Sequence, residues 1–267
     1  MKYYFLSDAH LGTRVVSDTH AHEQKLVDWL DMAKLDATAI FLLGDIFDFW
    51  FEYKMVVPKG FTRLLGKLRE ITESGIPIHF FVGNHDLWTF GYLEQELGLI
   101  VHTAPMTVEL GDKQFFLAHG DGLGDKSRSF SFIRSIFHNK TCQRLFRSLI
   151  PSSWGLSFGF RWSESNRRKH DKNNVKFLGE DQEPLVLFAK HHALEHPIDF
   201  YVFGHRHIVL NLMLQSKTQV LIIGDFMREF SYAVFDGTTM AGANLPQLIT
   251  LPPDPIIFSI FIFPLLN

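Results

Sequence analysis

Five short apolar runs in this chain are each followed by histidine, aspartate or asparagine, and this pattern restricts the fold more than any other feature. The polar segments are "SDAH", "GDIFD", "GNHD", "HGD" and "GHRH", in that order. Short apolar runs that alternate with helical periodicity predict a sheet buried on both faces, with helices packed outside it. In such sheets the carboxyl ends of the strands form the ligand-binding edge, so we expect the polar groups to meet there.

Strands and helices are predicted in alternation over the first 83 residues. Strands are expected at 3–7, 38–44 and 76–83, with helices at about 18–34 and 61–74 between them. Beyond Leu99, strand-like runs recur at 106–110, 114–120, 198–205, 218–225 and 231–237. A long segment separates the run at 114–120 from the run at 198–205, so the sheet is interrupted by an insertion.

The insertion at 126–176 has a charge opposite to that of the rest of the chain. It holds twelve Lys and Arg residues against two acids, Glu164 and Asp171, whereas the whole chain has 26 basic and 29 acidic residues. The insertion is therefore basic and the remaining chain acidic. We predict a core at 1–125 and 177–250, a basic, apolar helical cap at 126–176 and a C-terminal tail at 251–267.

The cysteine count and the termini favour the cytoplasm. The single cysteine, Cys142, excludes an internal disulfide and a cysteine-rich zinc site. The N-terminal run meets Asp8 before a signal-peptide apolar region is complete, so nothing predicts export. The C-terminal "PPDPIIFSIFIFPLLN" has an apolar run shorter than the ~20 residues of a spanning helix. We expect this tail either to dock on the body of the protein or to contact a membrane surface.

The polar residues that follow the strands have the chemistry of a metal centre. The candidate ligands are Asp8, His10, Asp45, Asn84, His119, His205 and His207. Neutral imidazoles, carboxylates and one amide oxygen suit Mn, Fe, Zn or a similar divalent ion. Seven ligands exceed what one ion needs, so we predict two ions that share Asp45 as a bridge. Paired ions of this kind promote displacement at phosphorus and supply a hydroxide nucleophile at neutral pH.

In their order, the five motifs resemble those of the calcineurin-like metallophosphoesterase superfamily along nearly the whole chain. The resemblance implies an α/β fold, a four-layer α/β/β/α sandwich of two mixed sheets with a helical cap insertion. It places Asp8, His10, Asp45 and His207 around the first ion, and Asp45, Asn84, His119 and His205 around the second. His85 matches a histidine that contacts the phosphoryl group and can protonate a leaving oxygen, and Asp86 matches the residue that orients it.

Four longer segments resemble the UDP-2,3-diacylglucosamine pyrophosphatases of lipid A biosynthesis, a family within that superfamily. They are "SDAHLG", "GDIFDFWFEY", "HGDGLGDKSRSF" and "SESNRRKHDKNN". The resemblance implies a UDP-linked diacylated amino sugar as substrate, cleaved at its pyrophosphate bond to lipid X and UMP. It implies two divalent ions, with Mn favoured over Fe or Zn. It also implies a cap that grips UDP and the acyl chains and suits peripheral contact with the cytoplasmic face of the inner membrane.

Substrate contacts are expected both at the metals and in the cap. Asn84 and His85 are expected at the reacting phosphate, and the cap candidates are Arg128, Asn166, Arg167, Arg168 and Lys172. Trp50 follows Asp45 closely enough to contact substrate, although an aromatic residue here would equally suit the core. For the cap, the alternative is a basic amphipathic lid that merely covers the sheet.

One departure from the lipid A family lies at His85. The best-known members of that family have arginine where this chain has histidine, the general superfamily pattern. Arginine braces a diphosphate, while histidine can also donate a proton, so the reaction class is better supported than the substrate. A phosphodiester or phosphomonoester of a nucleotide or nucleic acid is the alternative substrate. A non-catalytic binding module would tolerate gaps in the metal set, and the sequence shows none.

Overall fold

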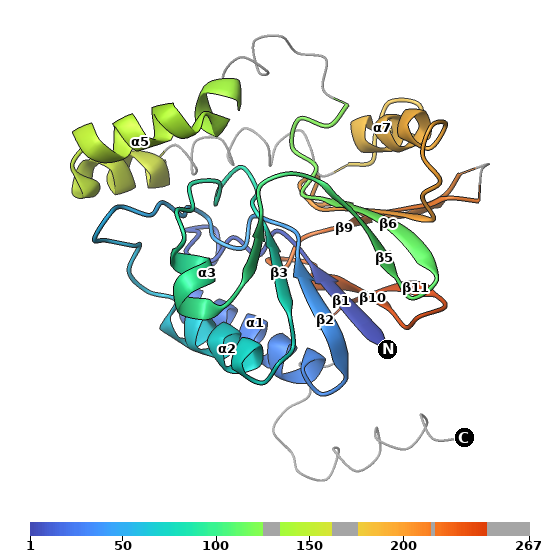
Figure 1. The fold of residues 1–267 in the computed structure, drawn as a ribbon, viewed down its shortest axis with the longest axis horizontal. Helices are drawn as coiled ribbons and strands as arrows, with labels where there is room; N and C mark the ends of the chain where they lie inside the picture. The colour runs from blue at the N-terminus through green and yellow to red at the C-terminus, as the bar shows by residue number, and fades with distance from the viewer. Residues whose placement is uncertain (125–133, 162–175, 215–216, 245–267) are drawn as a thin grey trace.

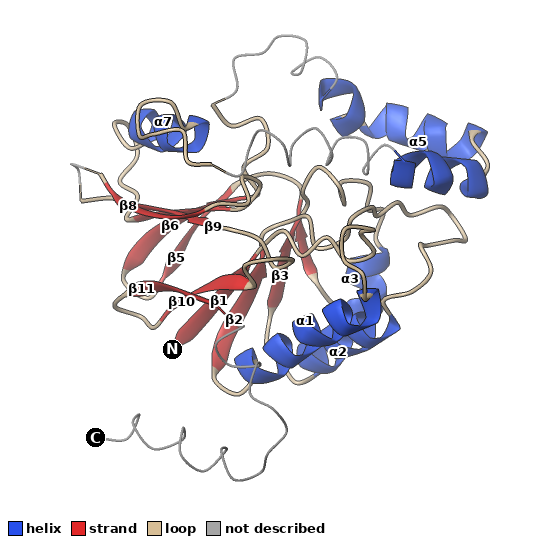
Figure 2. Ribbon diagram, turned by 180° about the vertical axis from the view of Figure 1, so that it is seen from behind, coloured by secondary structure: helices blue, strands red, loops and turns tan. Residues whose placement is uncertain are grey.

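The computed structural model of this protein describes residues 1–124, 134–161, 176–214 and 217–244. Two mixed sheets stack face to face, and helices cover their outer faces, as Figure 1 and Figure 2 show. The α/β/β/α order of layers that the resemblance implied is therefore confirmed.

The first sheet has six strands in the order β11-β10-β1-β2-β3-β4. They are β1 (Lys2–Leu6), β2 (Ala37–Leu42), β3 (Ile78–Phe81), β4 (Ile100–His102), β10 (Ser231–Phe235) and β11 (Met240–Asn244). Strands β1 to β4 are parallel, and β10 pairs antiparallel with β1. Parallel neighbours need long crossovers, which here contain α1 (Thr19–Ala33), α2 (Thr62–Glu73) and α3 (Tyr92–Leu97).

The second sheet has five strands in the order β5-β6-β7-β9-β8. They are β5 (Met106–Leu110), β6 (Lys113–Ala118), β7 (Phe200–Phe203), β8 (Val209–Met213) and β9 (Gln219–Ile223). Strands β6, β7 and β9 are parallel, and the edge strands β5 and β8 are antiparallel to their neighbours. Helix α7 (Pro184–His192) covers the outer face of this sheet (Figure 1).

Three apolar clusters fill the spaces between the four layers. Because successive strand residues point to opposite faces, neighbours on one strand enter different clusters. On β1, Tyr4 packs with the α1 side, whereas Phe5 packs between the sheets, where it stacks on Phe41 at 5.0 Å between ring centroids. On β6, Phe115 lies between the sheets and Phe116 lies under α7. Strands buried on both faces explain the continuous apolar runs in the sequence.

Four elements were not predicted from the sequence: α3, β4, β8 and β11. Each is short or lies at an edge of a sheet. Strand β4 has three residues, and most residues of β8 and β11 are exposed or half-buried. Edge strands need no continuous apolar run, so periodicity can miss them, although it did reveal the edge strand β5.

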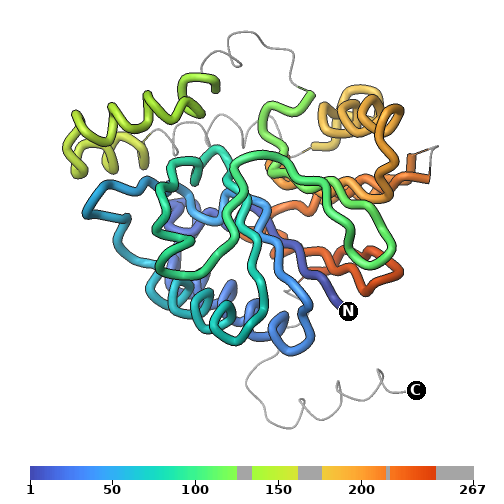
Figure 3. Tube along the Cα trace, viewed as in Figure 1, coloured from blue at the N-terminus to red at the C-terminus, as the bar shows by residue number. Residues whose placement is uncertain are grey.

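Within its described residues the cap has a helical turn at 134–138 and two longer helices, which lie side by side over the loops leaving β2 and β3 (Figure 3). They are α5 (Lys140–Leu149) and the helical residues 152–161. The Asn139 side chain begins α5 by accepting the backbone N–H groups of Thr141 and Cys142. The predicted cap residues Arg128, Asn166, Arg167, Arg168 and Lys172 lie outside the described residues, as does the tail at 251–267.

Candidate metal centre

The seven predicted ligands come from the ends of five strands, and the structure gathers them into one cluster. They follow β1, β2 and β3 in the first sheet and β6 and β7 in the second. Side-chain contacts join them in series: Asp8 with His10 and His207, Asp45 with His10 and His119, and His119 with Asn84 and His205. The site therefore lies where the carboxyl ends of both sheets meet.

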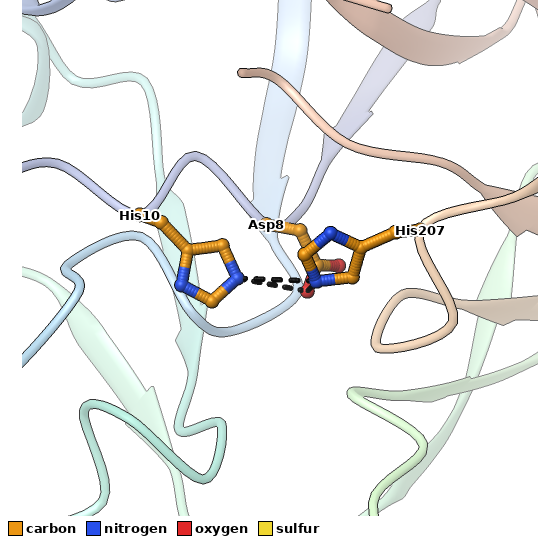
Figure 4. A group of neighbouring side chains, drawn as sticks. All are labelled: Asp8, His10 and His207. Atoms are coloured by element: carbon orange, nitrogen blue, oxygen red, sulfur yellow. Dashed lines mark hydrogen bonds and ion pairs between the residues drawn. The ribbon is translucent and has the colours of Figure 1, made fainter. Parts of the chain in front are cut away.

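Asp8, His10 and His207 form the first group (Figure 4). Asp8 Oδ1 lies 3.5 Å from His10 Nε2 and 3.2 Å from His207 Nε2, and the two nitrogens are 3.2 Å apart. Two atoms that each bind one ion at about 2.1 Å are separated by about 3 to 3.4 Å. These three atoms therefore have the spacing of ligands that share one ion.

Asp45 lies between this group and the second one. Its Oδ2 is 3.7 Å from His10 Nε2 and 3.4 Å from His119 Nε2. Beyond it, Asn84 Oδ1 lies 3.3 Å from His119 Nε2, and the His205 ring centroid lies 5.1 Å from that of His119. A carboxylate that faces both groups is placed as a bridging ligand must be.

The turns that carry these side chains have unusual backbone geometry. Asp8, His10, Asp45, His205 and His207 all have positive φ, between 45° and 67°. Non-glycine residues seldom adopt this conformation, and it is typically retained at functional sites because it aims side chains. Two glycines let the turns approach each other: a Cβ at Gly83 would lie 2.6 Å from Asp45 N, and a Cβ at Gly44 would lie 2.8 Å from Gly83 N.

Each of three histidines presents Nε2 to the cluster and Nδ1 to an oxygen outside it. His119 Nδ1 donates to the Leu43 carbonyl at 2.9 Å. His10 Nδ1 lies 3.6 Å from Asp48 Oδ1, and His207 Nδ1 lies 3.6 Å from Asp225 Oδ2. Such outer oxygens orient metal-binding histidines and leave the inner nitrogen free to act as a ligand.

Asp48 and Asp225 are site residues that the sequence analysis missed. Asp225 follows β9 in "LIIGDF" as Asp45 follows β2 in "FLLGDIF", so an apolar run ending in Gly-Asp was a signal that could have found it. Asp48 lies three residues after Asp45, where a carboxylate is common in any turn. Nothing local distinguishes it, and only its proximity to His10 and His85 reveals it.

The convergence of lone pairs around His119 requires a cation. Since the Leu43 carbonyl accepts the Nδ1–H, neutral His119 has a lone pair at Nε2 that faces oxygens of Asp45 and Asn84. Burial alone would lower the pKa of His119, but Asp45 outweighs it and holds the pKa well above its ordinary value. A divalent cation at this position would compensate the same carboxylate charge.

The first group, Asp8, His10 and His207, also has the arrangement of a cation site. Asp8 Oδ1 is buried and accepts no hydrogen bond of ordinary geometry from the described residues. Burial would raise the pKa of Asp8, but His207 and His10 hold it well below its usual range. Burial would lower the pKa of His207, yet Asp8 and Asp225 raise it to about 10. The residues present thus fit a divalent cation in the first group as well as the second.

His85 and Asp86 lie beside the cluster but do not form the pair that was predicted. His85 Nδ1 donates to the Asp48 carbonyl at 2.8 Å, and the His85 ring packs edge-on against His10. Asp86 instead accepts the backbone N–H groups of Gly83 and Ile46, at 2.7 and 2.8 Å. Asp86 is buried, and burial beside Asp45 raises its pKa to about 7. Asp86 thus contacts the backbone of the Asp45 turn, and the Asp48 carbonyl contacts His85.

Trp50 lies in the core, which its sequence position left open as the alternative to substrate contact. Its side chain is 1% exposed and belongs to the core cluster under α1 to α3, packed against Phe47 at 4.4 Å between ring centroids. Its indole N–H donates to Glu52. A substrate would have to displace this packing to reach the indole.

Replacing Asp225 with asparagine is expected to weaken metal binding about 10-fold. The amide oxygen can still accept the N–H groups of Met227 and Arg228, but the negative charge beside His207 is lost. Chelator competition with Mn would measure the change. Asp236→Asn is the matched control, because Asp236 accepts N–H groups from Thr238 and Thr239 in an exposed turn. Equal affinities for the two variants would contradict the role given to Asp225.

Comparison with known proteins adds a family and several relatives. A family model described as calcineurin-like phosphoesterase matches residues 13–209. A UDP-2,3-diacylglucosamine hydrolase of Porphyromonas gingivalis is 44% identical over 259 residues, which are 92% of this chain and 98% of the relative. One of Vibrio cholerae is 25% identical over 90% of this chain and 95% of the relative. A solved phosphoesterase from E. coli, 14% identical, has a TM-score of 0.45 over 92% of this chain and 94% of its own.

Proposed function

This chain belongs to the calcineurin-like phosphoesterase family, and from that membership we propose that it hydrolyses the pyrophosphate bond of UDP-2,3-diacylglucosamine. The products are 2,3-diacylglucosamine 1-phosphate, which is lipid X, and UMP. The observation that carries the proposal is the 44% identity to the Porphyromonas gingivalis hydrolase, which extends over 98% of that relative. The cluster of buried His and Asp side chains supplies the chemistry that such a reaction needs.

Asp8, His10, Asp45 and His207 would hold one ion, and Asp45, Asn84, His119 and His205 the other. When bound, the two ions supply positive charge for the phosphoryl transition state and activate water as the nucleophile. The donor set contains nitrogen and oxygen and no thiolate, which supports Mn as the metal, with Fe and Zn as the alternatives. A Mn, Fe and Zn titration of the metal-free protein, followed by activity at saturation, distinguishes the three.

His85 would contact the phosphoryl group and protonate the leaving oxygen. Its Nδ1–H is committed to the Asp48 carbonyl, so Nε2 is the nitrogen that exchanges a proton with substrate. Its backbone N–H donates to Asp45 Oδ1 at 2.8 Å, which ties the acid to the proposed bridging carboxylate. This contact would hold the backbone of His85 beside the residues that would bind the metals.

The substrate is tested with purified protein and Mn. UMP release from UDP-2,3-diacylglucosamine is compared with release from UDP-N-acetylglucosamine, which has no long acyl chains, and with hydrolysis of a small activated diester. We expect kcat/KM for the diacylated substrate to exceed that for UDP-N-acetylglucosamine by about 100-fold or more. Cleavage of the small diester without UMP release from the diacylated substrate would refute the proposed substrate and leave the reaction class intact.

We also place the cap against the membrane that holds such a lipid, at the cytoplasmic face of the inner membrane. None of the described helices is both long and apolar enough to cross a bilayer. The cap helices nevertheless expose large apolar side chains, with Trp154 at 73% and Phe158 at 54%, and Leu145 and Leu149 on α5. Arg144 and Arg161 are exposed on the same helices. Apolar side chains flanked by bases suit the surface of an anionic bilayer.

Replacing Trp154 and Phe158 together with serine is expected to weaken binding to anionic vesicles by about 10-fold or more, because each side chain contributes apolar area to the bilayer interface. Cosedimentation with phosphatidylglycerol vesicles measures the partition coefficient. The matched control is Leu35→Ser with Leu194→Ser, two exposed apolar residues away from the cap helices. If both double variants lose the same amount of binding, the cap is not the docking surface.

A further inference from the structure

The first described turn of the cap is held by a carboxylate that belongs to the metal-site loop. Arg134 Nε donates to Asp121 Oδ2 at 2.8 Å, and His138 Nε2 lies 3.7 Å from the same oxygen. Arg134 and His138 are four residues apart, so they lie on one face of the helical turn at 134–138. Asp121 itself is buried and follows His119 by two residues. One side chain of the core thus contacts two side chains of the cap.

The loop is shaped to receive the guanidinium. Gly122 has a φ of +72°, and a Cβ there would lie 2.8 Å from Arg134 Nε and 2.9 Å from its Cδ. Arg134 therefore lies directly against the loop backbone, and a side chain at position 122 would displace the guanidinium. Such close contact is expected if the cap is attached to the core at this loop, and not if it only covers the sheet.

A second contact holds the other side of the same turn. Phe137 is near the end of the helical turn, where carbonyl groups have no partner within the helix. Its carbonyl accepts both the Trp88 indole N–H at 3.1 Å and the Gln143 side-chain amide at 2.6 Å. Trp88 also packs edge-on against Phe146 of α5, at 5.1 Å between ring centroids. Gln143 is buried, so this junction is closed to water.

Both attachments originate in loops that carry predicted ligands of the second ion. Asp121 follows His119, and Trp88 follows Asn84 by four residues. The side chains of His119 and Asn84 face each other at 3.3 Å. The position of this pair and the position of the cap are therefore determined by the same two loops.

We propose that Asp121 and Trp88 are positioning residues that align the cap with the metal centre. This inference rests on the proposed function, because it concerns a substrate that the cap and the metals hold together. If the cap grips the lipid-linked end, the attachment determines where the pyrophosphate lies relative to the ions and to His85. A small diester needs no such alignment, since it reaches the metals without using the cap.

The test uses the full-length protein loaded with Mn. Asp121→Asn and Arg134→Gln are each expected to lower kcat for UDP-2,3-diacylglucosamine about 10-fold, with KM changed less than about 3-fold and hydrolysis of a small activated diester unchanged. The double variant should lose no more than the worse single variant, because both break one contact. Arg63→Gln removes one exposed positive charge outside the cap and is the matched control.

Equal loss on both substrates would show that Asp121 supports the metal site alone, and additive losses would show that the two residues act separately; either result overturns the proposal. Trp88→Phe, which keeps an aromatic ring but removes the N–H, should lower kcat for the large substrate in the same selective way. Hydrogen exchange gives a readout that needs no substrate: amides of 134–149 should exchange faster in Arg134→Gln than in wild type. Unchanged exchange in that segment contradicts the attachment itself, whereas failure of the wild-type protein to release UMP refutes only the substrate.

Discussion

Replacing Asp45 with alanine is expected to remove hydrolysis of every substrate, with a fall in kcat of about 10⁴-fold or more. Asp45 faces His10 and His119, one from each group, so its loss would remove the carboxylate that we propose two ions share. It also removes the acceptor of the His85 backbone N–H, which would loosen the proposed acid. Turnover of the small activated diester at saturating Mn is the appropriate measurement, because that substrate does not depend on the cap.

The control for this variant is Asp28→Ala, which removes an exposed carboxylate from α1. Metal content, measured after gel filtration, should fall in Asp45→Ala and stay constant in Asp28→Ala. Appreciable diester turnover by Asp45→Ala with two ions bound would rule out a shared bridging carboxylate at this position.

Replacing His85 with alanine is expected to lower kcat about 10²- to 10⁴-fold while the protein keeps its metals, as for loss of a general acid. The reason is that His85 touches the cluster through its ring contact with His10 but points its Nδ1 at a backbone carbonyl outside it. We propose that it contacts a phosphoryl group beside the ions. Steady-state kinetics and metal analysis of the same samples separate a proton donor from a ligand.

His85→Arg refines this prediction. Arginine can bind a diphosphate but cannot readily give up a proton. Compared with His85→Ala, this variant should therefore restore KM toward the wild-type value more than it restores kcat. His20→Ala, at an exposed position of α1, is the control for loss of an imidazole. A parallel loss of metal and activity in His85→Ala would show that His85 is a ligand and that the role proposed here is wrong.

Most of the central fold was predictable because its signals are local. The continuous apolar runs of β1, β2 and β3 reflect strands buried on both faces, and the helical periodicity between them reflects α1 and α2. Three of the four edge strands, β4, β8 and β11, gave no such signal, because an edge strand can be half-exposed and short. Prediction from periodicity is therefore strongest where burial is greatest.

The residues of the candidate site were predictable for a related reason. The apolar runs show where strands end, so Asp8, Asp45, Asn84, His119 and His205 could be assigned to the carboxyl ends of strands without knowing the topology. The backbone strain that aims them was not visible. Positive φ at Asp8, His10 and Asp45 is imposed by the surrounding structure. The residue types at these positions do not indicate it.

The sequence by itself determined which side chains arrive at the carboxyl edge, because order along a strand and the period of two are local properties of the chain. Only the tertiary structure decided what each side chain does there. It paired His85 with the Asp48 carbonyl and turned Asp86 to the backbone of the Asp45 loop, contrary to expectation. It buried Trp50 in the core, brought Asp225 to His207 and attached Arg134 to Asp121. These outcomes depend on side-chain direction and on contacts across different elements of the fold, and the local pattern of residues specifies neither.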